Sequence, residues 1–252
     1  MKKLLIANWK MNPKSIAAAQ ALFELVKKAV KTVKSVQVVI CPPAVFLPIL
    51  VASVSARKSS GGLAFGSQNC HWETQGAFTG EISATMLAQA GAEYVILGHS
   101  ERRQFMGETD EIINLKIKTA LKAKLKPVFC VGEKSGEELS AILEEQLTRG
   151  LAGLSVKQMA EVIIAYEPAW AIGSGNPCLP DSALSASLFI RKILTKLYSR
   201  FLAEQTSILY GGSVAVGQDA VYLKQSAMNG LLVGGVSLDA DEFIQIIKNV
   251  DF

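Results

Sequence analysis

Apolar and polar positions alternate along the chain in two different ways. Short runs rich in Val, Ile and Leu are each followed by a longer stretch in which apolar residues recur at helical spacing. The runs begin near Leu4, Val36, Leu63, Glu93, Pro127, Val162, Ser207 and Gly230. Such alternation predicts a parallel sheet covered by helices, and eight units in 252 residues is the size of a closed (β/α)8 barrel. A doubly wound open sheet is the alternative fold.

The alternation continues without interruption along the chain. No internal stretch is rich enough in polar residues, Pro, Gly and Ser to be a linker, so we expect one α/β domain over residues 1–252 with eight parallel strands. Asp, Ser or Thr stands before several helical stretches and indicates where those helices begin. These positions are Ser15, Thr109-Asp110, Asp181 and Asp239.

One segment, residues 35–56, contains no charged residue and is long enough to span a bilayer. Pro42, Pro43 and Pro48 interrupt it, so a short buried strand, a loop and a packed helix are expected instead. The first residues are similar to a signal peptide, but polar residues from position 8 onward end the apolar stretch. We therefore expect neither export nor membrane association.

The composition and charge narrow the class of ligand. Hydrophobic residues make up 50% of the chain, which is enough for a sizeable core. Lys and Arg number 26 against 22 Asp and Glu, giving a net charge of +4, and the lysines are scattered along helical stretches. This mildly positive charge suits a small anionic substrate better than a nucleic acid, so nucleic-acid binding is not expected.

The cysteines and histidines give no sign of a metal site. The chain has four cysteines, Cys41, Cys70, Cys130 and Cys178. They form no C-x-x-C pair, which argues against a metal knuckle or a disulfide framework. Only two histidines, His71 and His99, could complete a zinc site. We therefore expect no metal and no cofactor, and reduced thiols in a cytoplasmic protein.

In a barrel of this kind, the residues that follow the strands form the catalytic face. Glu167 directly follows an apolar run, as a general base would. Pro168 fixes the chain beside it, while Gly173 and Gly175 leave the far end of an apolar loop free to swing, as in a closing lid. The predicted lid comprises Pro168, Ala169, Trp170, Ala171, Ile172, Gly173, Ser174, Gly175 and Asn176. A solvated carboxylate before an ordinary turn is the alternative.

Two further candidates follow the first and fourth runs. Lys10 supplies a cation that could bind a phosphate, stabilise an oxyanion or form a Schiff base. His99 precedes a predicted helical turn, and because a helix N-terminus disfavours imidazolium, His99 could act as a neutral hydrogen-bond donor. A surface amine and a structural histidine are the alternative interpretations.

Glycine pairs follow the last two runs. Gly211-Gly212-Ser213 and Gly234-Gly235 offer backbone N–H groups without Cβ obstruction, which suits a phosphate cradle. Phosphate sites often form after strands seven and eight of such barrels. A base, a neutral donor, a fixed cation, a phosphate cradle and a lid together predict proton transfer beside the carbonyl of a phosphorylated substrate. The lid would exclude the water in which an enediolate loses its phosphate.

The motifs at these positions closely resemble those of the triosephosphate isomerase family, from Asn8 to about Leu238. The matching pieces are Asn8-Trp9-Lys10-Met11-Asn12, Gly76-Ala77-Phe78-Thr79-Gly80-Glu81, Gly98-His99-Ser100-Glu101-Arg102-Arg103, Cys130-Val131-Gly132-Glu133, Tyr166-Glu167-Pro168, Trp170-Ala171-Ile172-Gly173, Tyr210-Gly211-Gly212-Ser213-Val214 and Val233-Gly234-Gly235. The resemblance implies a TIM barrel that interconverts dihydroxyacetone phosphate and D-glyceraldehyde 3-phosphate in glycolysis and gluconeogenesis.

The resemblance also implies a role for each residue. Glu167 would move the proton between adjacent carbons, His99 would polarise the carbonyl, and Lys10 would stabilise negative charge. Asn8 would assist Lys10, and Glu101 would orient it through an ion pair. The phosphate would be held by backbone N–H groups of Gly173, Ser213, Gly234 and Gly235.

A homodimer is a further implication. Residues 70–79 are long for a β-to-α connection and are a candidate contact loop. In the family this loop docks into a neighbouring subunit, and the residue that matches Thr79 reaches the other active site. The chain departs from the family at the lid, where Ser174-Gly175-Asn176 stands in place of Thr-Gly-Lys and Ala169 replaces a larger apolar residue. These departures touch the hinges of the lid rather than the reacting atoms.

These residues leave two alternative functions open. One is another phosphate-binding barrel enzyme, such as an epimerase or a Schiff-base aldolase acting through Lys10. The other is a non-catalytic barrel that binds a sugar phosphate. The joint presence of Lys10, His99 and Glu167 favours the isomerase over both.

Overall fold

The computed structural model describes residues 2–54, 62–172, 177–214, 216–225 and 227–252. Its eight strands form a closed parallel barrel in chain order, with β8 paired back onto β1. The strands are β1 (Lys3–Asn8), β2 (Val36–Cys41), β3 (Leu63–Ser67), β4 (Tyr94–Leu97), β5 (Lys126–Val131), β6 (Ile163–Tyr166), β7 (Ile208–Tyr210) and β8 (Gly230–Val233). Each begins within one residue of its predicted start. The closed sheet confirms the (β/α)8 barrel and excludes the open doubly wound alternative.

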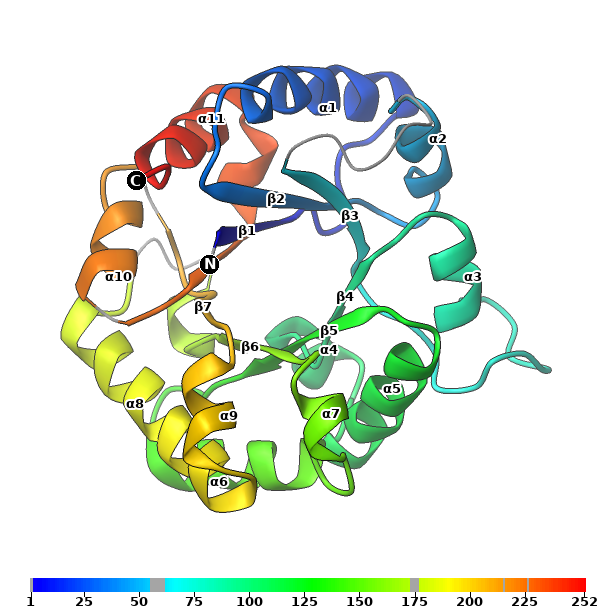
Figure 1. Cartoon of the computed structure of the whole chain (residues 1–252). Helices are drawn as coiled ribbons and strands as arrows, with labels where there is room; N and C mark the ends of the chain where they lie inside the picture. The colour runs from blue at the N-terminus through cyan, green and yellow to red at the C-terminus, as the bar shows by residue number, and fades with distance from the viewer. Residues whose placement is uncertain (1, 55–61, 173–176, 215, 226) are drawn as a thin grey trace.

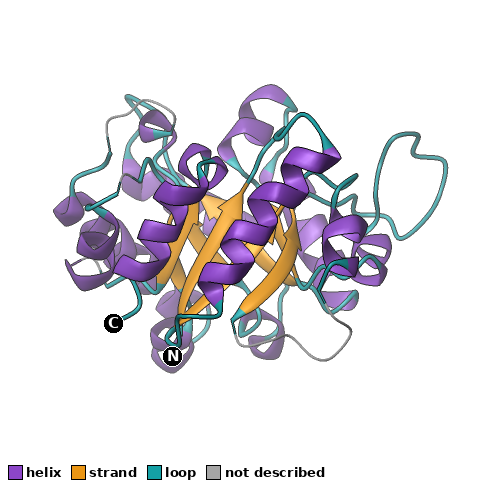
Figure 2. Cartoon of the chain, turned by 90° about the horizontal axis from the view of Figure 1, so that it is seen from above, coloured by secondary structure: helices purple, strands orange, loops and turns teal. Residues whose placement is uncertain are grey.

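Helices surround the barrel, as Figure 1 shows along its axis and Figure 2 shows from the side. They are α1 (Ile16–Val30), α2 (Leu47–Ala52), α3 (Ala84–Gln89), α4 (Ser100–Phe105), α5 (Asp110–Lys122), α6 (Leu139–Gly150), α7 (Val156–Met159), α8 (Pro180–Leu197), α9 (Arg200–Gln205), α10 (Asp219–Gln225) and α11 (Ala240–Asn249), with 3-10 turns η1 (Ala169–Ala171) and η2 (Gly235–Leu238). The connection between β3 and α3 projects away from the barrel in both views. The uncharged segment 35–56 contains β2 and α2, as predicted. Within the described ranges, no helix is long and apolar enough to cross a membrane.

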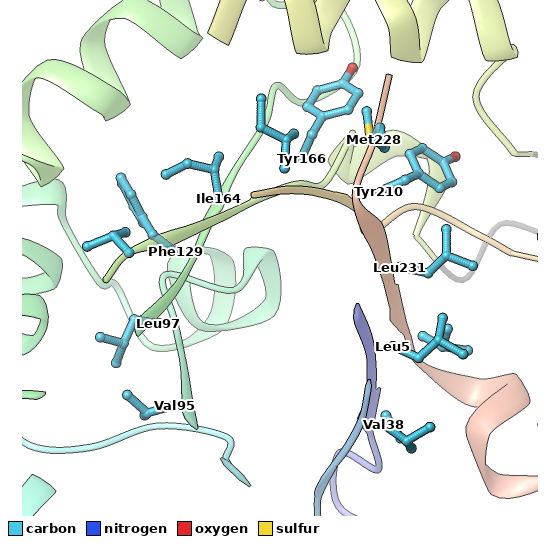
Figure 3. Close-up of a cluster of buried hydrophobic side chains, with 14 of the residues drawn as sticks. Leu5, Val38, Val95, Leu97, Phe129, Ile164, Tyr166, Tyr210, Met228 and Leu231 are labelled. Atoms are coloured by element: carbon cyan, nitrogen blue, oxygen red, sulfur yellow. The ribbon is translucent and has the colours of Figure 1, made fainter. Parts of the chain in front are cut away.

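Alternate residues of the strands enter two different cores. On β5, Val128 and Cys130 lie in the cluster inside the barrel, whereas Phe129 and Val131 lie in the cluster between the barrel and the helices. Figure 3 shows outer-cluster side chains of several strands, among them Phe129. Because both faces of each strand are buried, the strands are continuous apolar runs rather than alternating ones.

The predicted helix starts are confirmed at three positions and wrong at one. Side-chain oxygens of Ser15, Thr109 and Asp239 accept hydrogen bonds from the first turns of α1, α5 and α11. Asp181 is not the cap of α8, because it lies in the first turn. Leu179 holds the cap position there and Pro180 follows it. Proline suits the first helical position because its missing N–H would have no partner there.

The barrel interior provides a first testable prediction. Leu209 on β7 is fully buried inside the barrel, whereas Leu188 on α8 is 54% exposed. Leu209→Ala leaves a cavity in a closed layer of side chains, so we expect the free energy of unfolding to fall by about 2–5 kcal/mol. Leu188→Ala is the matched control and should change it by less than about 0.5 kcal/mol. Urea denaturation followed by circular dichroism measures both, and equal changes would contradict this view of the core.

Candidate active site

A cavity of about 510 Å³ lies at the carboxyl ends of the strands. It brings together most of the predicted site: Asn8, Lys10, His99, Glu167, Gly211, Gly212, Ser213, Gly234 and Gly235 line it. These residues follow the first, fourth, sixth, seventh and eighth strands. The barrel therefore gathers into one cavity groups that are distant in sequence.

Glu167 is held with one carboxylate oxygen anchored and the other one available. Its side chain is 2% exposed, and Oε2 accepts a hydrogen bond from the Ser100 N–H at 3.2 Å. Within the described residues, Oε1 is buried without a hydrogen-bond partner and lies 3.4 Å from His99 Nε2. This oxygen faces the cavity side of His99 and is the one placed to take a proton from a substrate, as a general base would.

Glycine at position 211 makes room for this carboxylate. A Cβ atom at Gly211 would lie 2.7 Å from the Glu167 Cγ atom, closer than side-chain carbons approach. Any larger residue would push the stem of the base out of place. The glycine predicted for the phosphate cradle thus also makes room for the Glu167 side chain.

His99 is a neutral imidazole by its hydrogen bonding. It caps α4, and its Nδ1 accepts a hydrogen bond from the Glu101 N–H at 3.2 Å. A ring nitrogen that accepts cannot carry the proton, so the proton is on Nε2. This nitrogen faces Glu167, and the side chain lines the cavity. His99 can therefore donate a hydrogen bond to a substrate oxygen without being charged.

Lys10 occupies a strained backbone conformation that several contacts hold in place. Its φ of 52° lies in the left-handed region, which costs free energy for a residue with a Cβ atom. Its N–H donates to Asn8 Oδ1 at 3.1 Å, and its C=O accepts from Gln68 Nε2 at 2.8 Å. The ammonium group forms an ion pair with Glu101, as the resemblance implied. A fixed positive charge in the cavity follows from these contacts.

The residues predicted to cradle a phosphate lie after the last two strands and line the cavity. Gly212 and Ser213 follow β7, and Gly234 and Gly235 follow β8 beside the start of η2. A Cβ at Gly234 would lie 3.3 Å from Lys10 Cε, so glycine also lets the lysine pass. Backbone N–H groups at such turns attract phosphate oxygens.

The predicted lid is described in part. Residues 168–172 form a turn in which the Trp170 indole N–H donates to Glu133 Oε1 at 2.7 Å, and the Tyr166 hydroxyl donates to the same carboxylate at 3.2 Å. Gly173, Ser174, Gly175 and Asn176 lie outside the described residues. The chain after them is held at Cys178, whose N–H donates to the Tyr210 hydroxyl at 3.0 Å.

Sequence reasoning gave no role to Glu133 or Gln68. Glu133 follows β5 by two residues, so the strand-end rule that selected Glu167 also applies to it. Gln68 follows β3 and donates to backbone oxygens of Lys10 and Cys41. No local pattern marks an amide whose partners are backbone atoms of Lys10, which follows β1, and of Cys41, which ends β2. Thr79 is exposed on the β3–α3 connection and does not line this chain's own cavity.

The closed barrel and the acid–base groups at the ends of its strands define a (β/α)8-barrel enzyme. A triosephosphate isomerase family model matches residues 3–250. The triosephosphate isomerase of Carboxydothermus hydrogenoformans is 45% identical to the chain, over 98% of this chain and 99% of that protein. Those of Endomicrobium trichonymphae and Aquifex aeolicus are 43% and 41% identical, over 98% of this chain and 98% and 99% of theirs. The chain belongs to the triosephosphate isomerase family.

The four cysteines give a second testable prediction. All are free and buried. Burial raises the pKa of Cys70 to about 12, and burial with the charge of Glu133 raises the pKa of Cys178 to about 11. Burial also raises the pKa of the Cys41 and Cys130 thiols. A raised pKa keeps a thiol protonated to higher pH, so at pH 8 only about one Cys178 in 10³ is a thiolate.

We therefore expect the native thiols to resist an aromatic disulfide reagent at pH 8. In denaturant the pKa values return to the ordinary range near 8.5, and all four thiols should react within minutes. The measurement is the absorbance of the released thiolate with time. A thiol in the native protein that reacts at the denatured rate would show that its burial is lost in solution.

Proposed function

We propose that the protein interconverts dihydroxyacetone phosphate and D-glyceraldehyde 3-phosphate through an enediolate. One observation carries the proposal: Glu167 Oε1, which has no hydrogen-bond partner in the part of the chain that the structure describes, lies 3.4 Å from His99 Nε2, in a cavity with a fixed cation. The base removes a proton from the carbon beside the carbonyl, and the donor faces the oxygens on which charge develops. The reaction belongs to glycolysis and gluconeogenesis.

Each group has a defined step in this mechanism. Glu167 takes the proton from the hydroxymethyl carbon of the ketose, and the electron pair of that C–H bond forms the enediolate. His99 Nε2–H and the Lys10 ammonium stabilise the negative oxygen, with Asn8 beside them. Glu101 keeps Lys10 in place through their ion pair. His99 gives its Nε2 proton to the former carbonyl oxygen and regains one from the hydroxyl group of the first carbon. Glu167 then returns its proton to the neighbouring carbon, which gives the aldose.

Groups of the same cavity would bind the substrate phosphate, and the reaction itself needs no cofactor. The substrate phosphate is held by N–H groups of Ser213, Gly234 and Gly235, with Gly173 completing the set. Moving a proton between adjacent carbons is an internal redox change, so no external oxidant or reductant is required. We therefore assign no cofactor, no metal and no nucleic-acid partner.

A Schiff-base reaction at Lys10 fits the structure less well. The nucleophile in that chemistry is the neutral amine. The Lys10 nitrogen is instead held in an ion pair with Glu101. A non-catalytic sugar-phosphate binder would have no need for a buried carboxylate oxygen that has no hydrogen-bond partner within the described residues. Borohydride reduction in the presence of substrate would trap a Schiff base if one formed.

We also propose a cytoplasmic homodimer. A second cavity of about 520 Å³ adjoins the first and shares Asn8, Lys10 and His99 with it. Exposed apolar side chains, Met11, Ile82, Phe105 and Met106, line it. The projecting β3–α3 connection of a second copy, with its Thr79, is the occupant that the family resemblance implies. Free cysteines fit a reducing compartment.

The role of Glu167 gives a third prediction. Glu167→Gln keeps the shape of the side chain but cannot accept the proton, so kcat should fall by about 10²–10⁴-fold while KM stays within about threefold. Glu161→Gln, which changes an exposed carboxylate near the opposite end of β6, should leave both constants unchanged. A coupled assay of D-glyceraldehyde 3-phosphate turnover in excess chelator measures them. Near-normal kcat in Glu167→Gln would remove Glu167 as the base.

The dimer gives a fourth prediction. Two chains of 27.0 kDa give 2 × 27.0 = 54.0 kDa, which light scattering should find at micromolar concentration. Phe105 is 68% exposed beside the second cavity, whereas Phe201 is 75% exposed on α9. Phe105→Lys should shift the mass toward that of one chain, because a charge is costly to bury in an apolar contact. Phe201→Lys should leave the mass unchanged. A wild-type mass of 27.0 kDa would refute the dimer.

A further inference from the structure

The backbone of Cys178 is held on both sides by tyrosine hydroxyl groups. Its N–H donates to the Tyr210 hydroxyl at 3.0 Å, and its C=O accepts from the Tyr222 hydroxyl at 2.6 Å. The two tyrosine rings are stacked, with centroids 3.9 Å apart and planes 13° apart. Both side chains are buried, so these hydrogen bonds are made away from water.

The two hydroxyl groups play different parts in these hydrogen bonds. The Tyr210 oxygen accepts from the Cys178 N–H, whereas the Tyr222 hydroxyl donates its proton to the Cys178 carbonyl, which can only accept. Burial raises the pKa of both tyrosines, so the Tyr222 hydroxyl keeps the proton that its hydrogen bond needs.

The hydrogen bonds of Cys178 with the two tyrosines join three elements that meet at the predicted phosphate cradle. Cys178 lies between the predicted lid and α8, Tyr210 is the last residue of β7, and Tyr222 lies on α10. Figure 3 shows the Tyr210 side chain leaving β7 in the outer cluster of apolar side chains. The residues that follow Tyr210 are Gly211, Gly212 and Ser213, so a shift of its backbone moves the cradle.

The Tyr210 ring also touches the cradle directly. A Cβ atom at Gly212 would lie 2.3 Å from the Tyr210 hydroxyl oxygen and 2.6 Å from Cζ. The phenol therefore packs against the Gly212 backbone, and the Tyr222 ring stacks on that phenol. Packed groups of this kind transmit small displacements because they leave no free volume.

We propose that Tyr222 is a positioning residue for substrate phosphate. It braces the Tyr210 ring against Gly212 and holds the carbonyl side of Cys178, and so fixes the N–H groups of Gly212 and Ser213. Neither Tyr210 nor Tyr222 is among the described residues that line the cavity, so Tyr222 acts through its neighbours. The inference rests on the proposed function, since it assigns the phosphate to this cradle.

The test replaces one hydroxyl and keeps the ring. Tyr222→Phe removes the hydrogen bond to Cys178 and preserves the stack on Tyr210. Tyr198→Phe is the matched control, because the Tyr198 hydroxyl also donates to a backbone carbonyl, that of Leu151, at 3.1 Å. Tyr198 lies at the end of α8 and does not line the cavity. Two quantities are measured: KM and kcat for D-glyceraldehyde 3-phosphate, and the Kd of glycerol 3-phosphate, which has the phosphate but no carbonyl.

In Tyr222→Phe we expect KM and this Kd to rise together by about fivefold, with kcat changed by less than about twofold. Tyr198→Phe should keep both near the wild-type values, even where its Tm falls as much as that of Tyr222→Phe. Unchanged KM and Kd in Tyr222→Phe would overturn the proposal. A fall in Tm or kcat without a rise in Kd would also overturn it, because that pattern belongs to a purely structural tyrosine.

A double-mutant cycle with Tyr210→Phe adds a second readout. Since the two hydroxyls hold the same residue, Cys178, and the two aromatic rings are stacked, the fold rise in Kd of the double variant should be well below the product of the two single rises. Independent effects of the two substitutions would contradict this coupling. Wild-type protein that binds glycerol 3-phosphate without isomerising the aldose would refute the proposed function, while the Kd values would still decide the role of Tyr222.

Discussion

The pairing of β8 with β1 is the constraint on which the site depends. Leu4 and Gly230 lie opposite each other in this pair, and a Cβ at Gly230 would stand 1.9 Å from the Leu4 carbonyl oxygen. Only glycine allows the first and last strands to approach this closely. Their approach places Lys10, which follows β1, beside Gly234, which follows β8. A cation from one end of the chain and the N–H groups proposed to bind phosphate from the other therefore share one cavity.

Within that cavity the fold maintains two unfavourable arrangements. Lys10 has a left-handed backbone, and Glu167 has a buried oxygen without a hydrogen-bond partner among the described residues. Each would relax in an isolated peptide, and each persists because surrounding contacts outweigh its cost. The contacts are ordinary ones: an amide from Gln68 to Lys10, and the Ser100 N–H to the second Glu167 oxygen. Both arrangements fit the proposed proton transfer, in which Lys10 is the fixed cation and Glu167 is the base.

The features that could be predicted from the sequence are those that depend on local pattern and on the order of the strands. Strand starts from Leu4 to Gly230 were correct to within one residue, because strands buried on both faces are continuous apolar runs. Lys10, His99 and Glu167 were found because a barrel exposes the residues that follow its strands. Asp181 was placed wrongly as a cap since Pro180 already satisfied the same helix start. The partners of Gln68 and Tyr222 depend on contacts between distant segments, and no spacing in the chain encodes them.

A cluster of charged side chains connects the helix that His99 caps with the projecting β3–α3 connection. Glu108 accepts hydrogen bonds from Arg102, which belongs to the helix that His99 caps, and from Lys116 on α5. Lys116 also donates to Asn69 Oδ1 at 2.9 Å, where the β3–α3 connection begins. The attraction between buried ions of this kind offsets little more than the cost of removing them from water, so their main effect is to fix the geometry around them. Here the cluster connects α4, which His99 caps, to the start of the loop that carries Thr79. One buried cluster therefore positions both the active site and the proposed contact with a second subunit.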